Sequence, residues 1–194
     1  MTRKTIKSGC GQVDDGGSMS VAAIVRHYGL KYGQKAQDEL GRFRQHRNMP
    51  SLRDAIGTAA QSRDSEGLRH KHQRRLKERD IANATKLLVD SAERIQECSN
   101  FHALLRHVDD ILAETPGVGE LYKYDVSLRI GAWLGHMPER VYLHAGTRIG
   151  AAALGLDTSD GMLEMSALPP ELQRLPACEV EDILCIYKGR FRKR

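Results

Sequence analysis

The clearest pattern in the sequence is a series of segments in which apolar residues recur every three or four positions, as on one face of an α-helix. Between residues 100 and 114 this face consists of Phe101, Leu104, Leu105, Val108, Ile111 and Leu112. Residues 121–134 are apolar around most of the helical circumference, which is typical of a helix buried among several others. Residues 115–120, between the two segments, read Thr-Pro-Gly-Val-Gly-Glu. The pattern therefore predicts two helices joined by a short turn that contains two glycines.

The same spacing predicts helices on both sides of this pair. They are expected at residues 21–28, ended by Gly29; after Gly33; after the capping residue Ser51; over Ile81 to Ile95, with the basic residues before it as the helix start or its lead-in; over residues 149–154, ended by Gly155; and from Cys178 to Tyr187. The stretch 141–147 fits two structures equally well, because Val-Tyr-Leu favours a strand while the residues around it favour helices. The expected fold class is all-α, a multi-helix orthogonal bundle.

Changes in composition divide the chain into four parts. Residues 1–18 combine Lys, Arg, Gly and Ser with few large apolar residues, which predicts a disordered basic arm. Residues 19–67 predict a short N-terminal helical region followed by a linker. Residues 68–187 predict the main helical domain, and residues 188–194 a mobile basic tail. At 194 residues the chain is long enough for one ordinary hydrophobic core.

The overall composition narrows the class of protein. Hydrophobic residues make up 40% of the chain and charged residues 28%, as in soluble globular proteins. No run approaches the roughly 18 apolar residues of a membrane span, and the N-terminal residues lack the apolar core of a secretory signal. The four cysteines lie too far apart for a tight metal site or a disulfide framework. We therefore expect a cytoplasmic protein with reduced thiols, no metal ion and no membrane partner.

Positive charge is concentrated in one run. The formal net charge is +5, and residues 69–79 are the most cationic part of the chain. Residues of this run that are expected to contact phosphate groups are Arg69, Lys71, Arg74 and Arg75. Such contacts would give an affinity that falls steeply with salt. A solvated helix end explains the run equally well, so the charge alone makes nucleic acid a candidate partner and no more.

The Pro-Gly-Val-Gly turn at residues 116–119, with a helix on each side, resembles the helix-hairpin-helix element of DNA-binding proteins, including the helix-hairpin-helix DNA glycosylases. The match covers roughly residues 100–135. The resemblance implies that the backbone amides of Gly117, Val118 and Gly119 contact a DNA phosphate without reading sequence. In that family a monovalent cation sometimes accompanies the contact, and no other cofactor is implied. Lys123 on the following helix would add positive charge.

The catalytic residues of those glycosylases have no match here. The family's Schiff-base lysine lies two positions after the second hairpin glycine, a position that Leu121 occupies in this chain. The family's aspartate sits in a Val-Asp-Thr-His stretch, and the nearest counterpart, residues 141–144, reads Val-Tyr-Leu-His. The resemblance therefore implies binding of DNA without glycosylase chemistry.

An enzymatic alternative rests on different residues. Residues 141–155 also resemble a segment of uncharacterised bacterial proteins that carry the same hairpin, which implies no particular activity. On a helix, His144 would share a face with Thr147 and Arg148, and such a set suits a phosphate or carboxylate group. The weak catalytic candidates for a nucleotide- or nucleic-acid-processing pocket are Tyr124, Asp125, His144 and Arg148. The competing interpretation is that Thr147 caps a helix and that His144 is a satisfied core residue.

Three functions thus remain open. The leading one is sequence-independent binding of nucleic acid, DNA more than RNA, by the hairpin amides and the basic run. The second is an enzyme acting on a nucleotide or nucleic acid, and the third is a helical protein-interaction module in which the hairpin is only a turn. The expected fold, an all-α orthogonal bundle that contains a helix-hairpin-helix element, is compatible with all three.

Overall fold

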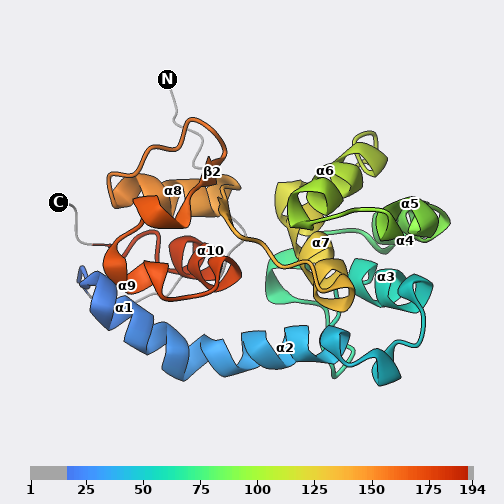
Figure 1. Ribbon diagram of the computed structural model, residues 1–194, viewed down its shortest axis with the longest axis horizontal. Helices are drawn as coiled ribbons and strands as arrows, with labels where there is room; N and C mark the ends of the chain where they lie inside the picture. The colour runs from blue at the N-terminus through green and yellow to red at the C-terminus, as the bar shows by residue number, and fades with distance from the viewer. Residues whose placement is uncertain (1–16, 192–194) are drawn as a thin grey trace. The chain divides into compact units, whose positions relative to one another are not determined.

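The computed structural model describes residues 17–191 and is mostly helical, which confirms the all-α expectation at the level of fold class (Figure 1). The only sheet among the described residues is a pair of two-residue strands. Within residues 17–191, no helix has the length and apolar composition needed to cross a bilayer.

The chain forms two compact units, and each is described by itself. Unit 1 comprises residues 17–28 and 140–191, and unit 2 comprises Gly29–Glu139. The domain boundary expected from the sequence falls between residues 67 and 68. In the structure these two residues lie inside unit 2, and the segments before and after them share one hydrophobic core. The predicted arm at residues 1–18 lies almost entirely outside the described residues.

Unit 2 is a bundle of six α-helices with short turns between them. Its elements are the π-helical turn η1 (Gly29–Gly33), α2 (Gln34–Arg44), the 3-10 turn η2 (His46–Asn48), α3 (Leu52–Ala60), the 3-10 turn η3 (Lys71–Gln73), α4 (Glu78–Asp90), α5 (Ala92–Gln96), α6 (Phe101–Ile111) and α7 (Glu120–Leu134). Helix α7 packs against α2, α3 and α6, and α3 packs against α4. Residues buried on different sides of α7 include Tyr122, Tyr124 and Ala132, as its apolar circumference predicts. Helix α7 is thus the centre of the unit.

Capping residues in the sequence determine where several of these helices begin or end. Ser51 and Asp54 form the predicted capping box at the start of α3, because each side chain bonds the other residue's backbone N–H. Asn100 caps α6 by accepting the N–H of Ala103 at 2.9 Å. Gly135, at φ +80°, ends α7 in the left-handed conformation that suits glycine.

One sequence prediction about a helix end is wrong, because Gly29 does not stop the helical run, which continues as the π-helical turn η1 into α2. Of the two interpretations of the basic residues 69–77, as the helix start or as its lead-in, the structure supports the lead-in. They form the 3-10 turn η3 and a loop, and α4 begins only at Glu78. The side chains of this loop are held by α7, as described below, so tertiary contacts decide its conformation.

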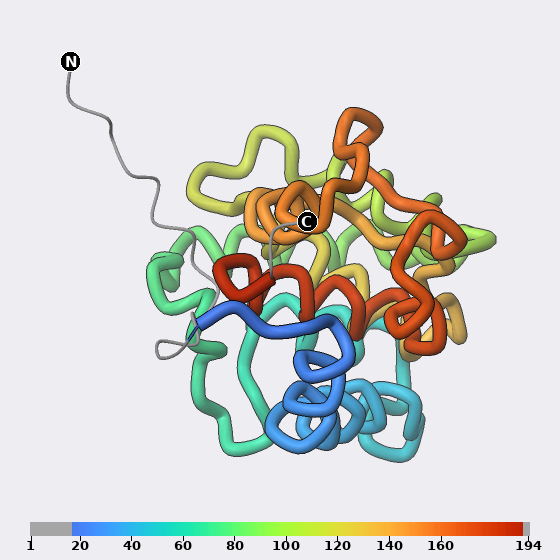
Figure 2. Tube along the Cα trace, turned by 90° about the vertical axis from the view of Figure 1, so that its left-hand side faces the viewer, coloured from blue at the N-terminus to red at the C-terminus, as the bar shows by residue number. Residues whose placement is uncertain are grey.

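Unit 1 combines short helices with the small sheet. Its elements are α1 (Val21–Tyr28), β1 (Val141–Tyr142), α8 (Ala145–Ala153), β2 (Met162–Leu163), the 3-10 turn η4 (Met165–Ala167), α9 (Pro170–Gln173) and α10 (Ala177–Ile186). The strand alternative holds for Val141–Tyr142, which pairs antiparallel with Met162–Leu163. Helices α8 (orange) and α10 (red) lie against each other (Figure 1 and Figure 2).

The C-terminal segment is part of this unit. Lys188 is buried and donates to the carbonyl oxygen of Cys185 at 3.0 Å, and Phe191 is buried beside Met19. The prediction of a mobile tail from residue 188 is therefore wrong for residues 188–191. Cys98 and Cys178 are free thiols.

Candidate functional site

The turn between α6 and α7 presents its backbone to solvent. Gly117 is exposed and adopts φ +80°, and Gly119 is exposed and forms the N-cap position of α7. The Val118 side chain packs against the core of unit 2 and so holds the turn in place. The amides of Gly117, Val118 and Gly119 donate no hydrogen bond to any acceptor in residues 17–191. Three backbone donors are therefore free at the N-terminus of a 15-residue helix.

The start of α4 packs beneath this turn. A Cβ atom on Gly117 would lie 2.7 Å from Oδ2 of Asp80, so that side chain would have to move, and the φ of +80° also favours glycine here. Asp80 is mostly buried, and Arg79 donates to its Oδ1 at 3.2 Å. Glu114 and Glu120 are exposed on either side of the turn. The turn thus offers amide donors in surroundings that are locally acidic.

The loop that leads to α4, residues 71–77, is held against α7 at its first end; we call it the basic loop. There His72 Nε2 and Gln73 Nε2 bond to Asp125 Oδ2 at 2.6 and 2.8 Å. Just beyond its second end, Asp80 in the first turn of α4 lies against Gly117 of the hairpin turn. The exposed cations of the loop are Lys71, Arg74, Arg75 and Lys77. The basic run and the hairpin turn, which are far apart in sequence, therefore lie side by side along the N-terminal half of α7.

Two residues expected at the interface are engaged elsewhere. The Arg69 side chain is mostly buried and donates to Glu78 at 2.6 Å. The Lys123 ammonium group donates to Asp109 at 2.6 Å. Both cations have a carboxylate partner at hydrogen-bond distance, so neither adds much positive charge for a ligand.

Asp125 holds the basic loop rather than lining an open pocket. Burial alone would raise the pKa of this carboxyl, but the adjacent His72 and, less strongly, Arg129 and Gln73 hold the pKa well below its usual range. Tyr124 is buried, with its ring packed edge-on against Phe101 at 5.8 Å between centroids. Neither side chain is placed as a general acid or base for an external substrate.

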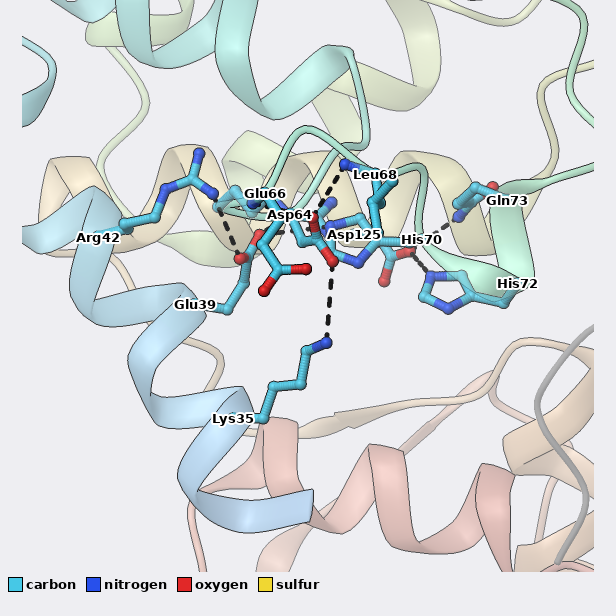
Figure 3. A network of polar contacts seen from close by, with 11 residues as sticks. Lys35, Glu39, Arg42, Asp64, Glu66, Leu68, His70, His72, Gln73 and Asp125 are labelled. Carbon is cyan, nitrogen blue, oxygen red and sulfur yellow. Dashed lines mark hydrogen bonds and ion pairs between the residues drawn. The ribbon is translucent and has the colours of Figure 1, made fainter. Parts of the chain in front are cut away.

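A second polar cluster connects α2 with α7 and was missed by the sequence analysis (Figure 3). Arg129, buried on α7, donates to Glu39 Oε1 at 3.1 Å, and His70 Nε2 lies 3.4 Å from the same oxygen. Arg42 lies 3.7 Å from the other oxygen of Glu39. Burial by itself raises the pKa of Glu39, but His70 and Arg129 outweigh it and lower this pKa from 4.5 to about 2. Only the three-dimensional fold brings these residues together.

This cluster predicts a loss of stability in acid. Because the folded-state pKa of Glu39 is depressed, its contribution is complete above pH 4.5 and is lost as the pH falls toward 2. We expect Glu39→Gln to lower the free energy of unfolding by about 2 kcal/mol at neutral pH, with a gap that closes between about pH 4.5 and 2. Urea unfolding at several pH values, followed by Trp133 fluorescence, measures this gap. The exposed Glu66→Gln is the matched control, and a pH-independent gap for Glu39→Gln would contradict the assignment.

The residues of the predicted enzyme pocket are bonded within their own units. In unit 1, Nδ1 of His144 accepts the N–H of Gly146 at 3.3 Å, and its Nε2 bonds to the buried Glu181. Arg148 donates to the carbonyl oxygens of Leu143 and Thr158. Asp125, in unit 2, is bonded to the basic loop. This placement agrees with a satisfied core histidine, and His144, Arg148 and Asp125 each have hydrogen-bond partners within their own unit.

The capping residue of α8 differs from the prediction. His144, and not Thr147, occupies the N-cap position. The Thr147 hydroxyl lies within the helix and donates to the carbonyl oxygen of His144 at 2.9 Å. Thr147 therefore contacts no open surface.

Comparisons of this chain with protein-family models, with curated proteins and with solved structures found no match. Its function is therefore inferred from the geometry of the described residues.

Proposed function

We propose that unit 2 binds the phosphate backbone of nucleic acid, DNA in the first instance, with little dependence on sequence. In this proposal α6, the turn and α7 act as a helix-hairpin-helix element, and the basic loop acts beside it. The observation that carries the proposal is the set of free amides at Gly117, Val118 and Gly119, next to a loop with exposed Arg74 and Arg75. Backbone amides at a helix N-terminus are well suited to phosphate oxygens.

The distribution of charge explains why the proposal needs both the hairpin turn and the basic loop. The N-terminus of α7 carries a partial positive charge of about +0.5, which Asp80, Glu114 and Glu120 oppose. The four exposed cations of the basic loop outweigh these carboxylates and attract a polyanion. If each cation neutralises one phosphate, log K falls with log salt at a slope of about −3 to −4. The amides then position the backbone and the loop supplies most of the affinity.

The hairpin contact is tested by Gly119→Asp. Its backbone at φ −106° and ψ 179° suits aspartate, and no atom lies within 4 Å of the added Cβ, so the variant should fold as a capped helix. As an N-cap, its carboxylate accepts the N–H of Leu121 or Tyr122, and its negative charge repels a phosphate group at the turn. We expect binding to a random-sequence duplex, measured by fluorescence anisotropy, to weaken by about tenfold or more. Gly119→Asn is the matched control without the charge, and equal binding by wild type and Gly119→Asp would remove the hairpin from the interface.

The basic loop is tested by the double charge reversal Arg74→Glu/Arg75→Glu. We expect about 100-fold weaker binding at low salt and a salt slope that is smaller by about 2. The control, Lys86→Glu/Arg94→Glu, makes the same change in net charge at exposed positions of α4 and α5. Equal losses in both double variants would show that only net charge matters. No binding by the wild type at about 50 mM salt would contradict the proposed function itself.

A further inference from the structure

An exposed aromatic stack lies at the C-terminal end of α7, opposite the hairpin turn. The rings of His46 and Trp133 are parallel within 18°, with centroids 4.5 Å apart. Trp133, the single tryptophan of the chain, is half-buried near the end of α7, and His46 is exposed in η2. The two residues are 87 positions apart in sequence, so the fold brings the rings together.

Two hydrogen bonds fix the orientation of the stack. The indole N–H of Trp133 donates to the carbonyl oxygen of the buried Met49 at 3.0 Å. His46 Nε2 lies 3.0 Å from the carbonyl oxygen of Trp133. A carbonyl oxygen only accepts hydrogen bonds, so Nε2 carries the proton and donates it. His46 therefore lies flat on the indole even though its side chain is exposed, which is unusual for a surface histidine without a role.

The outer side of this stack is open and positively charged. No other aromatic ring within residues 17–191 contacts His46. Arg44 and Arg47, on either side of it in sequence, are exposed, and Arg47 donates only to the neutral Gln45. A flat, exposed aromatic face with exposed arginines close to it in sequence is the combination that single-strand binding surfaces use for a base and its neighbouring phosphates.

From these contacts we infer that the open face of His46 stacks on an unpaired nucleobase of single-stranded nucleic acid, with Arg44 and Arg47 on the adjoining phosphates. A base inside a duplex already stacks on both faces, so the site selects unpaired strands or ends. The inference rests on the proposed function, because the turn and basic loop would hold the same strand. The two sites lie about 20 Å apart along α7 at 1.5 Å per residue.

Trp133 reports directly on this contact. An oligothymidylate of about 16 nucleotides spans both sites, and an abasic oligomer of the same length offers the phosphates without the bases. We expect the base-containing strand to quench Trp133 fluorescence and to bind about tenfold more tightly than the abasic strand. The abasic strand should bind through the phosphate contacts with little quenching. Equal affinity and equal quenching for the two strands would overturn the stacking site.

Variants at His46 separate stacking from structure. His46→Leu and His46→Phe both lose the ring nitrogen and its bond to Trp133, and only phenylalanine keeps a flat aromatic face. The tighter binding of the base-containing strand than of the abasic strand should disappear in His46→Leu and persist in His46→Phe. Loss in both variants would assign His46 a structural role and overturn the inference.

Two further measurements show whether a failure concerns the proposed function or only the identity of the ligand at His46. Binding of neither oligomer by the wild type, at low salt, would contradict the proposed function rather than the stacking site alone. Thymidine monophosphate is the test for a free nucleotide as ligand. Quenching by this mononucleotide at the same concentration as the oligomer would overturn the assignment to a strand, and quenching only at far higher concentration supports it.

Discussion

Replacing His144 with leucine is expected to lower the free energy of unfolding of unit 1 by about 3 kcal/mol, because it removes the imidazole N–H that donates to the buried Glu181 carboxylate. The backbone N–H of Gly146 donates to Nδ1 of His144, so Nδ1 carries no proton and Nε2 donates to Glu181. Both side chains are buried, at 7% and 6% exposure. Leucine would therefore leave the Glu181 carboxylate in the interior without this donor.

A double-mutant cycle isolates the pair. The variant His144→Leu/Glu181→Leu removes both polar groups, and we expect it to recover most of the stability lost in His144→Leu. Hydrogen exchange of the amides in α8 and α10 measures the opening free energy of this part of the chain. A loss below about 1 kcal/mol in the single variant would show that the pair is not a buried charge in solution.

Gly150→Ala is expected to destabilise unit 1 by about 3 kcal/mol or more, because it places a methyl group where the backbone of another helix lies. An added Cβ would lie 2.1 Å from the carbonyl oxygen of Leu184 in α10. A backbone atom cannot rotate away as a side chain can, so α8 and α10 would have to separate. Val180 and Leu184, which are fully buried, would then lose contacts.

The control for this substitution is Gly41→Ala. Gly41 also lies within a helix, α2, and nothing is within 4 Å of its added Cβ. Alanine should stabilise this helix by about 0.5–1 kcal/mol, since it reduces the entropy of the unfolded chain. Urea unfolding of both variants measures the two opposite shifts. Similar small effects at both glycines would contradict the close approach of α8 and α10.

Sequence patterns predicted the helices whose signals are local. The capping residues Ser51 and Asn100, and the periodic apolar face that begins at Phe101, place α3 and α6 within a few residues of their observed bounds. Gly135 and Gly155 follow the ends of their helices as expected, each with a positive φ. These features depend on neighbours within one helical turn, so they are present in the sequence itself.

Features that depend on distant neighbours were not predictable. Asp125 is an ordinary carboxylate in the sequence, and only the fold shows that its partners are His72 and Gln73. The pairing of Glu39 with Arg129 joins two helices that are 90 positions apart. The basic loop avoids a helical conformation because its side chains bond to α7, which overrides local helix propensity.

The candidate interface was only partly predictable for the same reason. Exposed glycines and cations can be recognised by residue type, and Gly119 and Arg74 are exposed in the structure. Whether a cation is already paired depends on the fold, so the ion pairs of Arg69 with Glu78 and of Lys123 with Asp109 were not predictable. The single tryptophan and the arginines around His46 were visible in the sequence, and their stacking was not.

The division of unit 1 into two chain segments has a consequence for biosynthesis. Helix α1 leaves the ribosome first, but α8 and α10, with which unit 1 is completed, follow only after all of unit 2 has been made. At about 5–20 residues per second, α1 waits for several seconds with an apolar face that includes Ile24. Unit 2 is continuous and can fold during that delay. The apolar face of α1 therefore stays uncovered until the second segment of unit 1 has been made, and slower translation of unit 2 would lengthen that exposure.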